Sequence, residues 1–287
     1  MSSVKIIECP RDAMQGIKTI IPTEVKVNYL QSLLDCGFDT LDFGSFVSPK
    51  AIPQMADTAQ VLSQLDLSNT ETKLLAIVAN LRGAQTAAGF EAIRFIGYPF
   101  SISENFQMRS THKTIDQSMI VLSEILSLAK QSGQKVVTYL SMGFGNPYGD
   151  PWSTEIVAQW TKTLVDLGCD IISLSDTVGS ASPAVISDLF SGLIPEFPHV
   201  EFGAHLHTTT DSWYDKVHAA YNAGCRRFDG AIQGFGGCPM AKDELTGNMP
   251  TEKLLNYCTD HKIEHGIAGT KFESAYTQAS HIFLNYH

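Results

Sequence analysis

"LVDLGCDIISLS", residues 164–175, is the stretch that decides the fold, because it joins the end of a helix to a buried strand. Its glycine, Gly168, suits the left-handed backbone conformation that ends a helix. The Ile- and Leu-rich residues after it are typical of a strand in a parallel sheet covered on both faces. The same phrase recurs as "LLDCGFDTLDF" (33–43), "TAAGFEAIRFIG" (86–97), "AKQSGQKVVTYLS" (129–141) and "AYNAGCRRFDGAI" (220–232). The repeat predicts a chain built from βα units.

Extending this reading along the chain predicts eight such units. The expected strands lie near 4–8, 40–44, 74–79, 92–97, 135–141, 170–175, 200–206 and 227–232. The expected helices lie near 23–36, 54–66, 81–88, 112–132, 153–167, 182–194, 212–223 and 251–261, with Thr23, Ser153, Ser182 and Thr251 as candidate caps at their starts. Eight units in a chain of this length predict a closed (β/α)8 TIM barrel. An open doubly wound sheet is the alternative, because alternation alone does not prove closure.

The end of the chain and the composition complete the fold prediction. Residues 270–287 predict an extra amphipathic C-terminal helix, and without any linker we expect one domain over 1–287. Hydrophobic residues make up 44% and charged residues 17% of the 287, as in a globular protein. The net charge of -10 and the pI near 5.3 argue against a nucleic-acid or anionic-membrane partner.

The sequence also indicates the cellular compartment of the protein. Its longest apolar run, "LLAIVA" (74–79), is too short to span a bilayer. The N-terminus, "MSSVKIIECP", has no apolar stretch like a secretory signal. Six cysteines occur without CxxC spacing, so reduced thiols rather than disulfides are expected. We therefore expect a cytoplasmic protein.

Polar side chains gather at the ends of the expected strands, where barrel enzymes carry their active sites. The set comprises Glu8, Arg11, Asp12, Asp42, Asp176, His205, His207, Cys238 and Asn248. In a strand, alternate side chains point to one face, so His205 and His207 are expected to face the same way.

Asp12, His205, His207 and Asn248 form a plausible ligand set for a divalent metal cation. A carboxylate, two imidazoles and an amide oxygen suit Mg²⁺ or Mn²⁺, and the same atoms can hold Zn²⁺. Each residue also has an ordinary structural reading: Asp12 can cap a turn, and Asn248 after Gly247 can belong to turn chemistry.

The remaining candidates have open alternatives as well. Arg11 beside Asp12 suits an anionic intermediate such as an enolate, or forms a structural ion pair with Glu8 or Asp176. Asp42 and Asp176 either orient the ligands or balance charge. Cys238 lies in a glycine-rich loop that can close over a ligand and bring a thiol for proton transfer, although a lone cysteine is more often inert packing.

Taken together, these motifs resemble the 3-hydroxy-3-methylglutaryl-CoA (HMG-CoA) lyases of the metal-dependent TIM-barrel lyase superfamily. The resemblance covers about residues 6–260. It runs through "ECPRDAMQ", "SFVSPKAIPQMAD", "NLRG", "GNPYGDP", "SLSDTVG", "AHLHTTTD" and "GFGGCPMAKDELTGNMPTE". It implies cleavage of HMG-CoA to acetyl-CoA and acetoacetate through an enolate, with an acyl-CoA as the small-molecule partner.

The resemblance also implies roles for single residues. Asp12, His205, His207 and Asn248 match the metal ligands, Arg11 the arginine that steadies the enolate, and Cys238 the mobile-loop cysteine of proton transfer. His205 is the candidate for handling the hydroxyl proton. Asp42 is expected among the catalytic groups, and Glu8, Gln15 and Asp176 among the substrate-binding groups. A homodimer is expected by resemblance and because symmetric oligomers are frequent.

Several positions depart from the family pattern. Asp42 stands where the family usually has Glu, and Thr208 replaces an Asp beside the second histidine. "AMQGI" (13–17) replaces "GLQNE", and Asn146 replaces a cysteine in "GNPYGD". A related lyase or aldolase acting on another 3-hydroxyacyl-CoA or a hydroxy-keto acid is therefore the alternative. A barrel that binds a metal or acyl-CoA without turnover is a further one.

Overall fold

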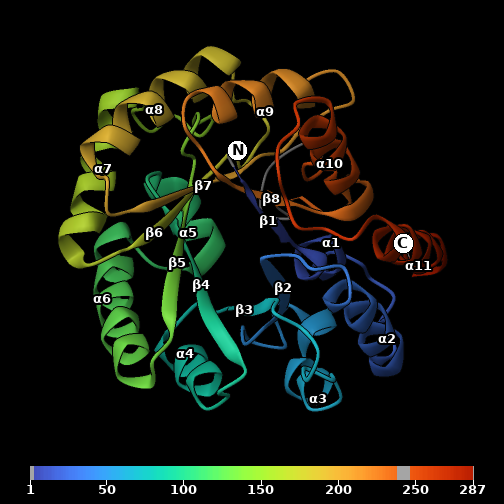
Figure 1. The fold of residues 1–287 in the computed structure, drawn as a ribbon. Helices are drawn as coiled ribbons and strands as arrows, with labels where there is room; N and C mark the ends of the chain where they lie inside the picture. The colour runs from blue at the N-terminus through green and yellow to red at the C-terminus, as the bar shows by residue number, and fades with distance from the viewer. Residues whose placement is uncertain (1–2, 238–245, 287) are drawn as a thin grey trace.

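The computed structural model describes residues 3–237 and 246–286, and in this part of the chain eight parallel strands close into a barrel (Figure 1). The strands follow chain order, and β1 pairs with β8 through Ile7 opposite Asp229 and Glu8 opposite Gly230. This pairing confirms the (β/α)8 barrel and excludes the open sheet. The strands are β1 (Lys5–Glu8), β2 (Thr40–Ser45), β3 (Lys73–Ile77), β4 (Ile93–Ser101), β5 (Lys135–Ser141), β6 (Ile171–Ser175), β7 (Glu201–His205) and β8 (Arg227–Gly230).

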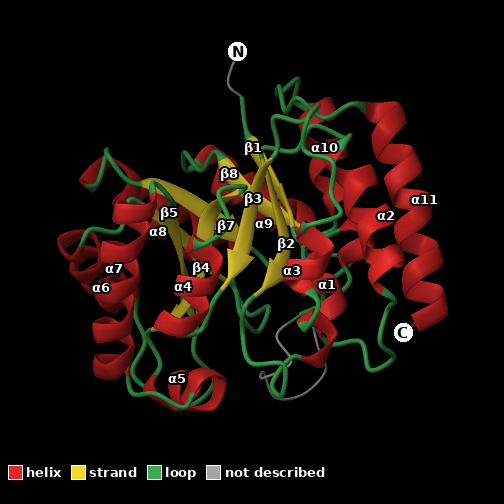
Figure 2. Cartoon of the chain, turned by 90° about the horizontal axis from the view of Figure 1, so that it is seen from below, coloured by secondary structure: helices red, strands yellow, loops and turns green. Residues whose placement is uncertain are grey.

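Helices surround this barrel and cover its outer face (Figure 1). The α-helices are α1 (Pro10–Gln15), α2 (Thr23–Leu34), α3 (Thr58–Leu62), α4 (Leu81–Ala88), α5 (Glu104–Thr111), α6 (Ile115–Ser132), α7 (Thr154–Leu167), α8 (Pro183–Glu196), α9 (Trp213–Asn222), α10 (Thr251–Asp260) and α11 (Gly269–Tyr286). Two short 3₁₀ turns are η1 (Pro53–Met55) and η2 (Ile232–Gly234). Helix α11 confirms the expected extra C-terminal helix, and it packs beside α2 (Figure 2).

The helix boundaries differ from expectation in three places. The helix expected over 112–132 begins at Ile115, because His112 adopts a left-handed backbone (φ 56°) that ends a separate helix, α5. The helix expected over 54–66 is shorter and is divided into η1 and α3. The six-residue helix α1 was not expected at all, although Pro10 at its first position is a known start signal.

Two of the four expected caps are confirmed. The side chains of Ser153 and Ser182 accept hydrogen bonds from backbone N–H groups of the first turn of α7 and α8. The cap prediction is wrong for Thr23 and Thr251, which are the first residues inside their helices. Their hydroxyls donate instead to Asp57 (2.8 Å) and Glu8 (2.5 Å).

The glycine prediction also needs one correction. Gly37, Gly133, Gly168 and Gly224 follow their helices with positive φ, as expected. Gly89 does not, because its φ of -72° keeps it in right-handed geometry at the end of α4.

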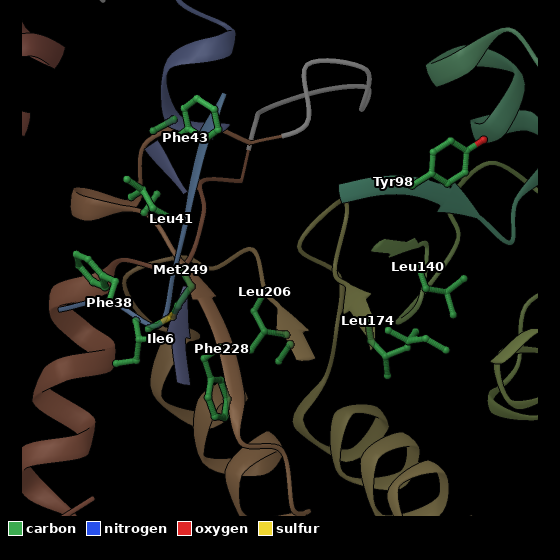
Figure 3. Packing of buried hydrophobic residues seen from close by; sticks show 14 of the residues in the cluster. Ile6, Phe38, Leu41, Phe43, Tyr98, Leu140, Leu174, Leu206, Phe228 and Met249 are labelled. Carbon is green, nitrogen blue, oxygen red and sulfur yellow. The ribbon is translucent and has the colours of Figure 1, made fainter. Parts of the chain in front are cut away.

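The main hydrophobic core lies between the barrel and its helices. Ile6, Leu140, Leu174 and Phe228, from four strands, belong to this cluster (Figure 3). Alternate residues of the strands point inward, where Leu75, Ile77, Phe95, Val137, Tyr139 and Ile171 form a second, smaller cluster.

Part of the barrel interior is polar. Arg227 and Asp229 of β8 are buried on the side of the strand opposite Phe228. Gly203 of β7 makes room for the arginine, because a Cβ atom there would lie 3.0 Å from Arg227 Cδ. A buried arginine replaces the branched apolar residues that usually fill such barrels.

Within the described ranges, the helices include none that combines the length and apolar character needed to cross a bilayer.

Candidate active site

A cleft of about 200 Å³ opens at the carboxyl ends of the strands. Its lining comes from segments at or just after the ends of β1 through β7. The lining residues are Arg11, Asp12, Gln15, Val47, Ile52, Ile77, Ala79, Pro99, Ser110, Thr111, Tyr139, Ser141, Ser175, Thr177, His205 and His207. This is the face on which barrel enzymes place their chemistry.

Three of the four predicted metal ligands converge at the floor of this cleft. One ligand atom each of Asp12, His205 and His207 lies within 4.8 Å of the other two. Asp12 is carried by α1 directly after β1, and His205 is the last residue of β7. The two imidazole rings lie 5.4 Å apart, which agrees with the expectation that alternate residues face one side.

Asn248 reaches the same place through a short pairing beyond the barrel. It forms an antiparallel bridge with His207, supported by hydrogen bonds from Thr208 N to Gly247 O and from Met249 N to Leu206 O. Its amide nitrogen donates to Asp12 Oδ2 (3.1 Å) and to the carbonyl of Phe235 (2.9 Å). The amide nitrogen therefore faces Asp12 here, whereas a metal would need the oxygen.

The donor set fits a hard or borderline divalent cation. The pKa of His207 falls to about 3, mainly because of burial and then because of His205, so its imidazole is neutral and can act as a ligand. Burial raises the pKa of Asp12, but Arg11 and the two histidines lower it more, so the carboxylate is ionised. A carboxylate with two imidazoles at one point suits Mg²⁺, Mn²⁺ or Zn²⁺.

Asp229, inside the barrel, orients the ring of His205. It was not predicted as a site residue from the sequence. Its Oδ2 lies 3.1 Å from Nδ1 of His205, which leaves Nε2 toward Asp12 at 3.7 Å. Metal-binding histidines usually pair their other ring nitrogen with such a carboxylate. Burial lowers the pKa of His205, but Asp229 and Asp12 together raise it above its ordinary value. The signal was present, because Arg227 and Asp229 are charged at alternate positions of a buried strand.

Arg11 is tightly held beside the metal-ligand candidates. Its Nε and Nη2 donate to both oxygens of Asp42 at 2.5–3.2 Å, and its Nη1 donates to Asp12 (3.2 Å) and Gln15 (2.9 Å). Burial raises the pKa of Asp42 to about 6 despite the guanidinium, so Asp42 is ionised at neutral pH. The sequence alternatives that paired Arg11 with Glu8 or Asp176 are therefore wrong, because its partner is Asp42.

Glu8 and Asp176 do not line the cleft, which corrects their expected place among the substrate-binding groups. The oxygens of Glu8 accept from Thr251 Oγ1 (2.5 Å) and Ile232 N (2.9 Å), which ties β1 to α10. Asp176 accepts from Lys216 Nζ (2.7 Å). That ammonium also donates to the carbonyl of His207 (2.8 Å), so Asp176 supports the ligand segment indirectly.

Gln15 lines the cleft as expected for a substrate-binding residue. Its amide nitrogen donates to Asp12 Oδ1 (2.5 Å). The catalytic candidate Cys238 lies outside the described residues. Gly236, two positions before it, approaches the ligand segments closely, because a Cβ there would lie 2.7 Å from both Asp12 O and Asn248 Nδ2.

The upper wall of the cleft was not predicted from the sequence. This wall combines two kinds of side chain. The apolar residues are Val47, Ile52, Ile77, Ala79 and Pro99, and the hydroxyl-bearing residues are Ser110, Thr111, Ser141, Ser175 and Thr177. Val47 and Ile52 lie within "SFVSPKAIPQMAD", and Ser175 and Thr177 within "SLSDTVG", but side chains of these types indicate no specific chemistry by themselves. The wall suits a substrate with an apolar portion.

Comparisons with known proteins agree with this geometry. A family model described as HMGL-like matches residues 4–277. The mitochondrial hydroxymethylglutaryl-CoA lyase of Bos taurus is 34% identical over 267 residues, which cover 92% of this chain and 81% of the bovine protein. The crystal structure of the HMG-CoA lyase from Brucella melitensis superposes with a TM-score of 0.89 at 29% identity, covering 98% of this chain and 99% of that one. The HMG-CoA lyase of Acinetobacter baumannii, solved with coenzyme A and 3-methylmalate, gives 0.87 at 29% identity over 96% of this chain and 89% of that one.

Proposed function

Because this chain belongs to the HMGL-like family, an enzyme family, we propose that it is a divalent-metal-dependent carbon–carbon lyase that cleaves HMG-CoA to acetyl-CoA and acetoacetate. The observation that carries the proposal is the convergence of Asp12, His205 and His207 beside Arg11 on the floor of one cleft. The acyl-CoA class of substrate is supported by the relative solved with coenzyme A.

Asp12, His205 and His207 would hold the cation, and Asn248 would join them through its amide oxygen. When bound, Mg²⁺ or Mn²⁺ supplies Lewis acidity that makes a substrate hydroxyl easier to deprotonate. Asp229 keeps the ring of His205 oriented, and Lys216 keeps the backbone of His207 in place.

The reaction requires a proton to leave the 3-hydroxyl and an electron pair to pass to the thioester fragment. His205 is the proposed acceptor of that proton; because its Nδ1 faces Asp229, the proton would go to Nε2, which would then no longer hold the cation. As the bond between C2 and C3 breaks, the hydroxyl carbon becomes the ketone of acetoacetate and the thioester fragment becomes an enolate. Cys238 is the proposed donor of the proton that converts this enolate to acetyl-CoA.

Arg11 is suited to stabilise the enolate because its charge is fixed in position before the reaction. The contacts to Asp42, Asp12 and Gln15 use four of the five guanidinium N–H groups. A thioester oxygen would be met by the remaining Nη2 hydrogen, or by Nη1 after Gln15 moves away. Asp42 holds the guanidinium plane during this step.

A second candidate is a lyase or aldolase for another 3-hydroxyacyl-CoA or hydroxy-keto acid, and the cleft wall favours a 3-hydroxyacyl-CoA without a free carboxylate. Arg11 is the only arginine or lysine among the described residues that line the cleft, and Asp42 already neutralises it. A substrate with a free carboxylate, as in HMG-CoA, would therefore be recognised mainly through hydroxyl groups and the cation.

A coupled assay for acetoacetate separates the two candidates. Purified protein with Mg²⁺ or Mn²⁺ is expected to release acetoacetate from HMG-CoA, and an Asp12→Ala variant should lose both turnover and Mn²⁺ binding. Release of product only from another acyl-CoA or hydroxy-keto acid in a panel would establish the second candidate. The homodimer and the cytoplasmic location remain predictions.

A further inference from the structure

The barrel interior beneath His205 holds a group of polar atoms that no protein group satisfies. Within the described residues, five buried atoms there have no hydrogen-bond partner: Tyr139 OH, Ser173 Oγ, Arg227 Nε and Nη2, and Asp229 Oδ1. A buried donor or acceptor without a partner is costly, and nearly all such groups in folded proteins are bonded to protein or to water. This concentration in one place therefore needs an explanation.

These side chains approach one another across the barrel. Tyr139 belongs to β5 and Ser173 to β6, while Arg227 and Asp229 belong to β8. Gly203 of β7 lies between them, and a Cβ atom there would be 3.0 Å from Arg227 Cδ and 3.1 Å from Ser173 Oγ. Its missing side chain allows the arginine and the serine to reach the same region.

Arg227 is anchored at one end only. Its Nη1 donates to Glu201 Oε1 (3.2 Å), and its guanidinium lies 6.0 Å from the ring centre of Phe95. Burial lowers the pKa of Arg227, but Asp229 and then Tyr139 raise it more, so the guanidinium is charged and interacts with Asp229. Nevertheless, among the residues that the structure covers, no direct hydrogen bond or ion pair joins Arg227 to Asp229.

Ordered water commonly bridges two buried polar groups that attract each other without direct contact. Arg227 and Asp229 are such a pair. The chemistry is complementary, since Arg227 offers two unpartnered donor nitrogens, Nε and Nη2, and Asp229 offers one free oxygen. The hydroxyls of Tyr139 and Ser173 can donate or accept, so they can complete the three or so hydrogen bonds that a buried water makes.

We propose that ordered water inside the barrel links Arg227, Tyr139 and Ser173 to Asp229 Oδ1, which makes Arg227 a positioning residue for the metal site. The other oxygen of Asp229 lies against His205 Nδ1 at 3.1 Å. A carboxylate fixed on both oxygens keeps the ring oriented so that Nε2 faces Asp12 and His207. The inference rests on the proposed function only in taking His205 as a metal ligand.

The first test measures Mn²⁺ affinity by electron paramagnetic resonance, without substrate. Arg227→Met should weaken Mn²⁺ binding about 10- to 100-fold, as loss of groups that support metal ligands commonly does. Arg227→Lys keeps the charge but loses Nε and Nη2, and it should weaken binding nearly as much. A wild-type dissociation constant in both variants would overturn the proposal.

The second test uses conservative variants that retain the shape of the core. If Tyr139 OH is bonded to water, Tyr139→Phe lowers the melting temperature, and Ser173→Ala does the same. Tyr29→Phe is the matched control, because its hydroxyl is also buried without a protein partner but belongs to α2, outside the barrel. Its change in melting temperature measures the loss of one buried hydroxyl outside the proposed network, and we expect a larger loss in the two barrel variants. A rise in both barrel variants would refute the water network.

These outcomes can be separated from failure of the proposed function. If the wild-type protein binds Mn²⁺ but cleaves no acyl-CoA, the reaction is wrong and the affinity comparison still decides the role of Arg227. If the wild-type protein binds no Mn²⁺, the metal assignment is wrong and the positioning role falls with it. The melting temperatures then decide whether the water network exists.

Discussion

Gly236→Ala tests whether the loop after β8 holds the proposed metal ligands in place. Gly236 has a φ of +90°, a conformation that is unfavourable for a residue with a side chain. An added Cβ would also lie 2.7 Å from Asp12 O, 2.7 Å from Asn248 Nδ2 and 2.9 Å from Ala13 Cα. Two of these three neighbours are backbone atoms, so the substitution must displace the segments that carry Asp12 and Asn248.

The magnitude has two parts that a control variant separates. The left-handed backbone alone costs about 1–2 kcal/mol for an L-residue. Gly133→Ala has this cost only, because Gly133 has a φ of +76° and nothing within 4 Å of the added Cβ. Displacement of the ligand segments should add a loss of about 10- to 100-fold in Mn²⁺ affinity, or about 1.4–2.7 kcal/mol.

The assay pairs calorimetric melting with Mn²⁺ titration of both variants. We expect both to melt earlier than the wild-type protein, and only Gly236→Ala to bind Mn²⁺ more weakly. Equal, wild-type Mn²⁺ affinity in the two variants would show that the approach of Gly236 to Asp12 and Asn248 has no part in holding the cation.

Three further changes test other parts of the site. Arg11→Met should lower kcat by about 10²–10³ with a small change in KM, because the enolate charge that it stabilises develops only in the transition state; equal losses in binding and turnover would instead indicate ground-state recognition. Cys238→Ser should slow turnover in the coupled assay and leave Mn²⁺ affinity unchanged, and weaker Mn²⁺ binding would make the thiol a ligand. Glu8→Gln should remove a pH dependence of stability: burial raises the Glu8 pKa from 4.5 to about 8, so its contribution is complete below about pH 4.5 and is lost as the pH rises through 8. At about 1.4 kcal/mol per pKa unit, the wild-type protein should lose several kcal/mol of unfolding free energy relative to Glu8→Gln across that range, and parallel denaturation curves for the two proteins would contradict the prediction.

The fold was largely predictable because its signals are local and repeated. A glycine at a helix end followed by a buried apolar run marks five of the eight βα units, as "LVDLGCDIISLS" does in a single line of sequence. The split between α5 and α6 was not predictable in this way. It depends on a left-handed histidine, His112, which is a rare choice at that position.

The site was predictable only where a residue's own chemistry is conspicuous. Asp12, His205 and His207 follow strand ends and are brought together as expected, and Asn248 joins them by pairing with His207 beyond β8. Asp229 was missed because its role depends on which way a strand residue points, and Glu8 was misplaced for the same reason. At the end of β1 the carboxylate of Glu8 turns outward to Thr251 rather than into the cleft. Inward and outward positions are set by barrel closure, which no single motif specifies.

The pairing of β1 with β8 has a consequence for how the protein is made. Asp12 and Asn248 meet across 236 residues of sequence, and their contact depends on the first strand finding the last. During synthesis the amino-terminal units emerge long before that partner exists. A ribosome-bound chain lacking the final unit can have much of its secondary structure and still be unable to bind the cation. Binding of the proposed cation is therefore a readout of completed folding, and a truncation before residue 248 should remove it altogether.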